Sequence, residues 1–458
     1  MAEPFSTPDS FADRVVLVCG TGMAGRSAIR ALVELGARVL VSDDRAEPPA
    51  LPDGVTFLGP VTEPPVETEA LMVSPGLPPT HPVLVAATER GLPIFGELEF
   101  ALRVQRDPAP IWLMVTGTNG KTTTVRMLES ILLAGGLRAV AVGNVGVPII
   151  DAVRASSPYQ VLAVEASSFQ LETSSSLRPL AGALLNLAED HLDWHGSMAA
   201  YAAAKTKVWA GEFAIGNADD ALVSQLLTEA AGRPSPRSTL RFTLTEPEVG
   251  EYGVRNGRLV TDTGADLIGA NEIRPSGPHN RANALAAAAL AGCIGLEPAV
   301  IAAGLRAFVP DRHRNEFVAE VGQIRYVDDS KATNPHAAAA SLASYRRVIW
   351  IAGGQLKGAD VEPLVVEFAD RLAGAVVLGV DRSRILTALA RHAPDLPVIE
   401  VARTDHGAMQ ESVAAATSLA AAGDVVLLAP AAASKDMFAS YGARGEAFAD
   451  AVRALANG

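Results

Sequence analysis

The sequence predicts an α/β protein of three domains, each built around a parallel sheet. Its 458 residues amount to about three domains of ordinary size. Short apolar runs alternate with helical patterns almost throughout, which is typical of βαβ units. Two passages rich in proline or charge, RVQRDPAP (103–110) and AFVPDRHRNEF (307–317), separate the blocks. We therefore predict domains at residues 1–108, 109–310 and 311–458.

The first block contains a strand, RVVLVCG (14–20), a helix, GRSAIRALVELG (25–36), and a second strand, RVLVSDD (38–44). The turn before the helix reads GTGMAG, and Asp43 lies 18 residues beyond Gly25, which together match a dinucleotide-binding fingerprint. Such a turn brings a helix N-terminus close to a pyrophosphate. Taken alone, this block predicts a Rossmann-like domain and leaves an NAD-dependent oxidoreductase open.

The second block opens with a strand, IWLMVTG (111–117), and a helix, KTTTVRMLESILLAGG (121–136). The loop between them ends in Gly120-Lys121-Thr122, like a G-x-x-x-x-G-K-[ST] phosphate loop. Val115 stands where that pattern has its first glycine, so the loop is a shortened form, G-T-N-G-K-T, that begins at Gly117. Backbone N–H groups and the helix N-terminus would face phosphate oxygens. Lys121 would neutralise the β and γ oxygens, and Thr122 would hold Mg²⁺. The flanking strand and helix favour this function over a plain turn with a surface lysine.

Two later strands of this block end in side chains that bind cations. YQVLAVE (159–165) ends at Glu165, and LAGALLNL (180–187) leads to His191. Because the carboxyl ends of parallel strands meet at one sheet edge, both side chains should converge beside the phosphate loop. Lys205, on its own, is expected to be a solvated helix residue. The sequence thus indicates an ATP–Mg²⁺ enzyme, and the absence of an N-K-x-D motif disfavours a GTPase.

The remainder of the chain continues the α/β pattern. Residues 240–275 are more polar and strand-like, and a helix is expected from about His279. The third block contains four predicted strands with helices between them: VIWIAGG (348–354), AGAVVLGV (373–380), LPVIEV (396–401) and DVVLLAP (424–430). This alternation predicts a third α/β domain.

The composition excludes several classes of protein. The formal net charge of −13 argues against binding a polyanion, so nucleic acid is not expected as a partner. Cys19 and Cys293 are too few for a disulfide framework or a cysteine-based zinc site. The first residues lack a basic segment followed by an apolar one, and the apolar run at 282–296 is too short to span a bilayer. We expect a cytoplasmic monomer without a membrane partner.

Motifs in all three blocks together resemble those of the Mur ligase family: GTNGKTT, EASSFQLE, NLAEDHLDWHG, GPHNRANALAA, HRNEF and DDSKATNP. EASSFQLE and APAAASKDMF favour the member that adds D-glutamate. The DNPR element of the diaminopimelate-adding member is replaced by ATNP, and another amino-acid-adding Mur ligase is the alternative. The resemblance implies an N-terminal Rossmann-like domain, a central P-loop ATPase-type sheet and a C-terminal Rossmann-like domain.

The resemblance also implies a reaction. The carboxylate of UDP-MurNAc-L-Ala attacks the γ-phosphate of ATP, and the amine of D-glutamate attacks the resulting acyl phosphate, as a step of peptidoglycan precursor synthesis. The protein then serves to position charges and to shield the acyl phosphate from water.

Family motifs carry residue roles onto this chain. The implied catalytic residues are Lys121, Asn144, Glu165, His191 and Lys205. The implied ATP-binding residues are Gly117, Thr118, Asn119, Gly120, Lys121, Thr122, Thr123, Asn283, Arg314 and Asp329. Thr122 and Glu165 would bind one Mg²⁺, while His191 and Lys205 would serve a second. Lys205 matches the lysine that is carbamylated in this family, which revises the expectation of a solvated side chain.

The two other substrates have their own matched residues. Those for the UDP-sugar are Thr21, Gly22, Met23, Ala24, Asp43, Asp44, Arg45, Ser74, Gly76 and Asn144. Those for D-glutamate are Lys331, Thr333, Lys357, Ser434 and Tyr441. This chain departs from the family pattern in two places: Gln355 and Leu356 replace Asp-Gly before Lys357, and Asp44 stands where relatives often have a hydroxyl.

Two other classes of function compete with the ligase. The glycine turn of the first block fits the diphosphate of a UDP-sugar as well as that of NAD, but we find no hydride-transfer site in the rest of the sequence. A non-catalytic nucleotide sensor would need neither Lys205 nor Lys357. Nicotinamide binding, compared with ADP release that depends on both substrates, separates the three classes.

Overall fold

The computed structural model describes residues 5–45, 50–232, 235–405 and 407–457. The chain divides into two compact units, Met1–Ala270 with Ala282–Phe308, and Asn271–Arg281 with Val309–Gly458. Three mainly parallel sheets with helices between their strands confirm the predicted α/β class. The boundaries predicted at 108 and 310 stay a prediction.

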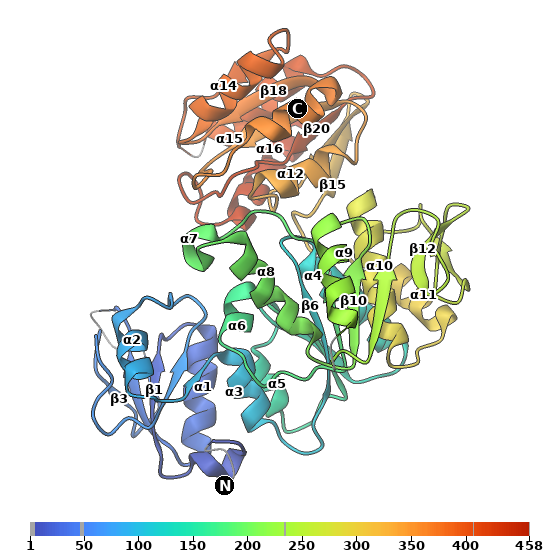
Figure 1. Cartoon of the computed structure of the whole chain (residues 1–458). Coiled ribbons are helices and arrows are strands. Elements are labelled where there is room, and N and C mark those ends of the chain that lie inside the picture. Colours follow the sequence, from blue (N-terminus) through green and yellow to red (C-terminus); the bar gives the residue numbers. More distant parts are fainter. Residues whose placement is uncertain (1–4, 46–49, 233–234, 406, 458) are drawn as a thin grey trace. The chain divides into compact units, whose positions relative to one another are not determined.

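The first sheet belongs to the first unit and is drawn in blue in Figure 1. Its order is β3-β2-β1-β4-β5, with all neighbours parallel. The strands are β1 (Val15–Cys19), β2 (Arg38–Ser42), β3 (Thr56–Phe57), β4 (Ala70–Val73) and β5 (Ile94–Phe95). The helices are α1 (Met23–Glu34), α2 (Pro82–Glu89) and α3 (Glu97–Val104), preceded by the short 3₁₀ helix η1 (Pro8–Phe11). The β1–α1–β2 unit predicted from the sequence is confirmed.

The central sheet also belongs to the first unit and has the order β14-β13-β12-β11-β10-β9-β6-β8-β7. The parallel strands are β6 (Ile111–Thr116), β7 (Ala139–Gly143), β8 (Val161–Glu165), β9 (Ala181–Leu184), β10 (Phe213–Asn217), β11 (Ser238–Phe242) and β12 (Glu251–Arg255). β13 (Arg258–Val260) and β14 (Asp266–Gly269) add to it in antiparallel direction. Strand β6 pairs with β8 on one side and β9 on the other, so the loops that follow these three strands are neighbours.

Helices connect these strands or follow the last of them. They are α4 (Lys121–Ala134), α5 (Ile149–Val153), α6 (Ser168–Glu172), α7 (Leu192–His195), α8 (Met198–Thr206), η2 (Lys207–Trp209), α9 (Ala221–Ala231), α10 (Pro278–Gly292) and α11 (Pro298–Ala307). The apolar strands β6 and β8 are buried almost along their whole length, because helices cover both of their faces. These strands form a rigid base for the loops at their carboxyl ends.

The third sheet lies in the second unit and has the order β15-β16-β20-β17-β18-β19. Its strands are β15 (Glu316–Val321), β16 (Ile324–Asp328), β17 (Val348–Gly353), β18 (Leu372–Leu378), β19 (Val398–Glu400) and β20 (Val425–Leu428). Its helices are α12 (Pro335–Leu342), α13 (Glu362–Phe368), η3 (Ala369–Arg371), α14 (Arg382–His392), α15 (Ala408–Leu419) and α16 (Tyr441–Asn457). Two apolar clusters pack on this sheet, as expected when helices cover both faces.

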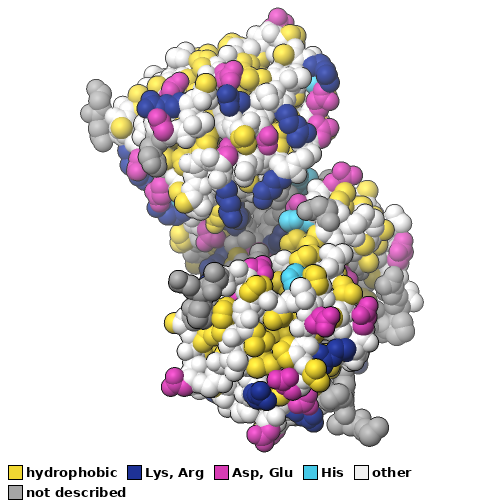
Figure 2. Space-filling model, turned by 90° about the vertical axis from the view of Figure 1, so that its left-hand side faces the viewer, with side chains coloured by type: hydrophobic (Ala, Val, Ile, Leu, Met, Phe, Trp, Pro, Cys, Tyr) yellow, Lys and Arg dark blue, Asp and Glu magenta, His cyan; other side chains and the backbone are white. Residues whose placement is uncertain are grey.

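Two expectations about the surface and the cysteines can be compared with the structure. Figure 2 shows acidic and basic side chains interspersed on the face it draws, without a continuous basic band. Cys19 and Cys293 are both free thiols, and burial raises the pKa of each to about 12. Within the described residues, no helix is both long and apolar enough to cross a membrane.

Candidate functional site

The loop between β6 and α4 has the geometry of a phosphate-binding loop. Gly120 has a φ of +84°, and a Cβ atom there would lie 2.4 Å from Oδ1 of Asn283, so only glycine fits. Helix α4 begins directly at Lys121. The Lys121 ammonium donates to the carbonyl oxygens of Gly117 and Thr118, at 2.8 Å each. The loop therefore holds a cation at its own mouth, next to a helix N-terminus.

Neighbouring segments fix the rest of this loop. Asn119 donates its backbone N–H to Oδ1 of Asn186 at 2.8 Å, and Nδ2 of Asn186 donates back to the Asn119 carbonyl at 3.1 Å. The Thr118 hydroxyl lies 3.1 Å from the Tyr201 hydroxyl and accepts from the backbone N–H of Ala188 at 3.0 Å. The loop is thus tied to the segment that follows β9. Asn186 was missed in the sequence, because nothing local distinguishes it from other asparagines after a strand.

Glu165 ends β8 as predicted and is 1% exposed. Its Oε1 accepts from Nδ2 of Asn144 at 3.0 Å, and the Asn144 backbone N–H donates to the Glu165 carbonyl at 3.0 Å. Its Oε2 is buried without a hydrogen-bond partner among the described residues. An unpaired buried carboxylate oxygen costs on the order of 1–3 kcal/mol or more. This oxygen is therefore suited to a divalent cation, which prefers carboxylate ligands.

Lys205 is buried, which contradicts the expectation of a solvated helix residue. Its side chain is 2% exposed, and its ammonium donates to the Gly117 carbonyl at 2.8 Å and lies 4.7 Å from the centre of the Tyr201 ring. Burial, followed by the nearby charge of Lys121, holds the pKa of Lys205 well below its ordinary value. A lysine in this position is prepared to lose its proton and react as a neutral amine.

His191 precedes α7 in a left-handed conformation, with a φ of +54°. Its ring packs against the ring of Phe169 with the centroids 4.7 Å apart, and Nε2 lies 3.6 Å from Oδ2 of Asp190. Unlike Glu165 and Lys205, its side chain is 46% exposed.

A cavity of about 320 Å³ joins these groups within the first unit. Its lining residues are Pro75, Gly76, Thr118, Lys121, Asn144, Ser167, Ser168, Phe169, Asp190, His191, Tyr201 and Lys205. The structure therefore brings together six residues predicted from the sequence, from five separate segments: Gly76, Thr118, Lys121, Asn144, His191 and Lys205. Glu165 and Thr122 are not among the lining residues. Ser167, Ser168 and Phe169 were missed as site residues, although they lie in the quoted motif EASSFQLE.

The turn after β1 is shaped for a bound diphosphate. A Cβ atom at Gly25 would lie 1.9 Å from the Gly20 carbonyl, which requires the third glycine of the motif. Helix α1 begins at Met23, and the space around Gly22 is open. The backbone N–H and hydroxyl of Thr21 donate to Asp43, at 2.7 and 2.6 Å. Asp43 therefore braces the turn.

The remaining residues matched to the UDP-sugar lie near this turn. Burial alone would raise the pKa of Asp43, but hydrogen bonds from Thr21 and Arg45 outweigh it and hold the pKa below its ordinary value. Asp44 and Arg45 are exposed, and the Ser74 hydroxyl donates to the Gly20 carbonyl at 3.4 Å. In the first unit, Thr123 and Asn283 are buried beside the phosphate loop.

The second unit places the other predicted residues around the ends of β16, β17 and β20. Asp329 accepts from the Asn315 backbone N–H at 3.2 Å and from the Ser341 hydroxyl. Burial raises the pKa of Asp329 to about 6, and the charge of Arg314 opposes that rise. The Lys331 ammonium lies 4.2 Å from the centre of the Tyr441 ring.

Ser434, Thr333 and Lys357 complete the predicted D-glutamate set. Ser434 is buried, whereas Lys357 is exposed and has a φ of +51°. Before Lys357, the backbone N–H of Leu356 donates to Oδ2 of Asp381 at 2.8 Å. A carboxylate from the start of α14 therefore contacts the segment where the family pattern would place an aspartate.

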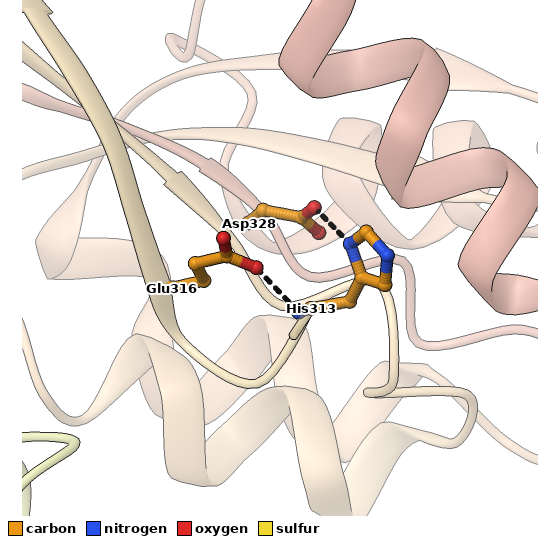
Figure 3. Close-up of side chains that lie close together, drawn as sticks. All are labelled: His313, Glu316 and Asp328. Atoms are coloured by element: carbon orange, nitrogen blue, oxygen red, sulfur yellow. Dashed lines mark hydrogen bonds and ion pairs between the residues drawn. The ribbon is translucent and has the colours of Figure 1, made fainter. Parts of the chain in front are cut away.

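His313, Glu316 and Asp328 lie together beside this region, within 4.8 Å of one another (Figure 3). Nδ1 of His313 is 2.7 Å from Oδ2 of Asp328, and the His313 backbone N–H donates to Glu316 at 2.7 Å. Because these atoms already bind one another, we interpret the cluster as a brace for the turn that carries Arg314. The Asp328 hydrogen bond raises the pKa of His313.

Comparisons with known proteins agree with these features. Three family models match: Mur ligase MurD-like, N-terminal domain, at residues 14–96; Mur ligase middle domain at 115–291; and Mur ligase, glutamate ligase domain, at 313–432. The chain is 51% identical to UDP-N-acetylmuramoylalanine--D-glutamate ligase of Thermobifida fusca (strain YX), over 97% of this chain and 99% of that protein. It is 48% identical to the protein of that name in Streptomyces coelicolor (strain ATCC BAA-471 / A3(2) / M145), over 98% and 99%.

Solved structures show the same fold at low identity. MurF from Acinetobacter baumannii superposes with a TM-score of 0.60 at 18% identity, covering 99% of this chain and 93% of that one. A pseudomurein peptide ligase type C from Methanothermus fervidus gives 0.59 at 19% identity, covering 96% and 100%.

Proposed function

The chain belongs to the Mur ligase family, and from this premise we propose that it is an ATP-dependent ligase that joins D-glutamate to UDP-N-acetylmuramoyl-L-alanine in peptidoglycan precursor synthesis. The relatives that support this substrate pair are similar over nearly their full length. The structural observation that carries the proposal is the cavity in which Lys121, Asn144 and Lys205 meet beside the phosphate loop. The oxidoreductase alternative is set aside, because Mur ligase models match all three parts of the chain, and the glycine turn of the first sheet can hold the diphosphate of a UDP-sugar as well as that of NAD.

The proposed reaction makes a carboxylate reactive toward an amine. The alanyl carboxylate takes the γ-phosphoryl group of ATP and ADP leaves; the amine of D-glutamate then attacks the acyl carbon, loses a proton, and phosphate leaves. Lys121 would exchange its contacts with Gly117 and Thr118 for phosphate oxygens, where its charge stabilises the transferring group. Asn144, held by Glu165, would orient the substrate carboxylate.

The residues present fit Mg²⁺. Glu165 offers a buried carboxylate oxygen without a partner among the described residues, and Thr122 offers a hydroxyl in the first turn of α4. We propose that these two side chains hold one ion and that His191 and Lys205 serve a second. When bound, Mg²⁺ neutralises the phosphate oxygens and lowers the repulsion that an attacking carboxylate meets.

We further propose that Lys205 is carbamylated. An ammonium cannot bind a cation, whereas the carbamate formed from a neutral amine and CO₂ supplies anionic oxygens. The burial of Lys205 and its lowered pKa favour the neutral amine that this reaction needs. A carbamate here would lie near Asp190 and Glu165, so bound Mg²⁺ would be needed to balance the local negative charge.

The other substrates are assigned by the same proposal. The diphosphate of the UDP-sugar would lie at Thr21, Gly22, Met23 and Ala24, with Asp43, Asp44 and Arg45 near the uracil and Ser74, Gly76 and Asn144 along the sugar. Arg314 and Asp329 would complete the ATP site, and D-glutamate would contact Lys331, Thr333, Lys357, Ser434 and Tyr441. Residues 1–108, 109–310 and 311–458 would then be the UDP-sugar, ATP and amino-acid domains of a cytoplasmic monomer.

An ADP-release assay across amino acids tests the function. With UDP-MurNAc-L-Ala and ATP present, D-glutamate should stimulate ADP release, and L-glutamate, D-alanine and diaminopimelate should not. Stimulation by a different amino acid alone would assign the chain to another member of the family. ADP release that needs neither substrate would indicate a simple ATPase.

A further inference from the structure

Helix α3 carries two buried carboxylates that contact the segment following β8. Glu97 is 4% exposed and Glu99 is 1% exposed. Glu99 accepts from the backbone N–H groups of Ser175 and Ser176, at 3.0 Å each, and forms an ion pair with Arg103. Glu99 therefore anchors the chain after α6, and its charge is balanced on its own helix.

Glu97 is different, because its partners lead to the candidate site. Its Oε2 accepts from Nε2 of Gln170 at 2.8 Å. Burial raises the pKa of Glu97, while Gln170 and the backbone N–H of Ile149, the first residue of α5, face the carboxylate and oppose that rise. The NH₂ of Gln170 and the backbone N–H of Ile149 can only donate. A carboxylate has two acceptor oxygens and can therefore face both groups, whereas an amide would turn its own NH₂ toward one of them. This explains why a carboxylate, rather than its neutral amide, occupies a position where burial penalises charge.

Gln170 passes this contact on to Ser167. Its Oε1 accepts from the Ser167 backbone N–H and from the Ser167 hydroxyl, at 2.9 Å each, and its own backbone N–H donates to that hydroxyl at 3.2 Å. A backbone N–H can only donate, so the amide oxygen of Gln170 must face Ser167 and its NH₂ must face Glu97. The orientation of the whole group is thus determined, and Gln170 is only 2% exposed.

Two strands of the site end beside these contacts. Ser167 lines the 320 Å³ cavity and follows the cation-binding candidate Glu165 on the loop after β8. Ile149 begins the helix that follows the Asn144 loop. Asn144 and Glu165 in turn hydrogen-bond each other through side chains and backbone. Glu97 therefore contacts both the segment that follows Asn144 and the segment that follows Glu165. The spacing of these two segments determines how Asn144 and Glu165 face each other.

We propose that Glu97 and Gln170 are positioning residues for ligation, which fix Ser167 and the Asn144–Glu165 pair in their reactive arrangement. This inference rests on the proposed function, because it assumes that the reaction is ligation. The arrangement of the side chains follows from the hydrogen bonds described above. Because Glu97 follows directly after the first sheet, the same contacts link the segment that ends the UDP-sugar domain to the loops of the phosphoryl-transfer site.

An exchange of the two side chains tests the pair. In Glu97→Gln, the new NH₂ group at position 97 faces either the NH₂ of Gln170 or the backbone N–H of Ile149. Two donors then meet, and one hydrogen bond is lost. In Gln170→Glu, two buried carboxylates face each other. The double variant Glu97→Gln/Gln170→Glu restores every contact: the new amide donates to the new carboxylate and accepts from Ile149, and the carboxylate accepts from Ser167. The charge of the pair is also unchanged.

The measurements are kcat, KM for each substrate and the folded fraction, from ADP release and thermal unfolding. We expect each single variant to lose about tenfold or more in kcat per folded enzyme, with KM for ATP changed less than about threefold, as for lost orientation. The double variant should return to within about threefold of the unmodified enzyme. Ser176→Ala, which removes a 2.5 Å hydrogen bond to Glu99, is the matched control and should alter stability but not kcat.

Each outcome decides the proposal. Single variants with normal kcat, or a folded double variant as slow as the singles, would overturn it. If a single variant does not fold, the double variant decides, because it should still fold and release ADP. A double variant that does not fold, or that folds and is inactive, would overturn the proposal. An unmodified enzyme that ignores D-glutamate contradicts the proposed function alone, and positioning is then measured with the amino acid that supports ADP release.

Discussion

The ammonium groups of Lys121 and Lys205 both donate to the same carbonyl oxygen, that of Gly117, at 2.8 Å each. Two like charges on one acceptor repel each other, which is part of why the pKa of Lys205 is lowered. The repulsion is relieved when an anion accepts one ammonium or when the other becomes neutral. A bound phosphate would accept the ammonium of Lys121, and carbamylation would remove the positive charge of Lys205.

Lys121→Ala should abolish most turnover while the fold stays intact. The charge of Lys121 is proposed to stabilise the transferring phosphoryl group, and such interactions are typically worth about 10²-fold or more in kcat. ADP release and circular dichroism together check this. Near-normal turnover in a folded variant would remove the phosphate-loop assignment.

The turn at Gly20–Gly25 should bind a UDP-sugar and not a nicotinamide cofactor. Titration of the full chain, without ATP, should give saturable binding of UDP-MurNAc-L-Ala, and NADH fluorescence should not change. Met23→Asp is the matched variant: it adds a negative charge at the first residue of α1, where the diphosphate is proposed to bind, and should weaken UDP-sugar binding at least tenfold. NADH that competes with the UDP-sugar would contradict the choice of ligand.

Asp329 should make the stability of the chain depend on pH. Its folded-state pKa of about 6 lies above the unfolded value of about 4, so the folded state holds this proton more tightly. The contribution is therefore fully present below pH 4 and is lost as the pH rises through 6, a change on the order of 1–3 kcal/mol.

Asp329→Asn should remove that change. The difference in unfolding free energy between the variant and the unmodified chain, from denaturant titrations, should shift in favour of the variant between pH 4 and 7. Asp395→Asn, at an exposed position, is the control. A difference that is constant across this range would mean that Asp329 is not buried in the way the structure has it.

The parts of the site that lie within one continuous segment could be predicted from the sequence. The phosphate loop was predictable because GTNGKTT contains its own glycines, cation and hydroxyl between a strand and a helix. Glu165 was predictable because a charged residue at the end of an apolar strand must lie at the sheet edge. The antiparallel addition of β13 and β14 was not, since a polar strand pattern does not indicate its direction.

The roles of side chains that depend on contacts with distant segments could not be predicted from the residue pattern. Lys205 lies on a helix whose pattern does not say what covers it, and its partner Gly117 is 88 residues away. Glu97 appears as an ordinary acidic residue in the first turn of a helix until Gln170 and Ile149 are seen to contact it. The family resemblance supplied Lys205, and nothing in the sequence marked Glu97.

Carbamylation of Lys205 is the last prediction. A neutral amine reacts with CO₂, and burial, together with the charge of Lys121, lowers the pKa of this lysine and so favours the neutral amine. Lys205→Ala should lose most activity because the anion is removed, and a short carboxylic acid in the medium should restore part of it by filling the vacated space. Lys205→Glu should rescue only weakly, because its carboxylate is several atoms shorter than a carbamate.

Two measurements separate the carbamate from a plain lysine. With ¹³C-bicarbonate, a carbamate carbon signal should appear in the unmodified protein and in Lys207→Ala, and should be absent from Lys205→Ala. Lys207 is the matched control, since it lies two positions along the chain and donates to the Glu172 carbonyl outside the cavity. Depletion of bicarbonate should lower the activity of the unmodified enzyme reversibly. A Lys205→Ala variant that turns over normally, or an unmodified protein without the carbon signal when Mg²⁺ and ATP are bound, would show that Lys205 acts as a simple buried amine, and the second cation would then lack this ligand.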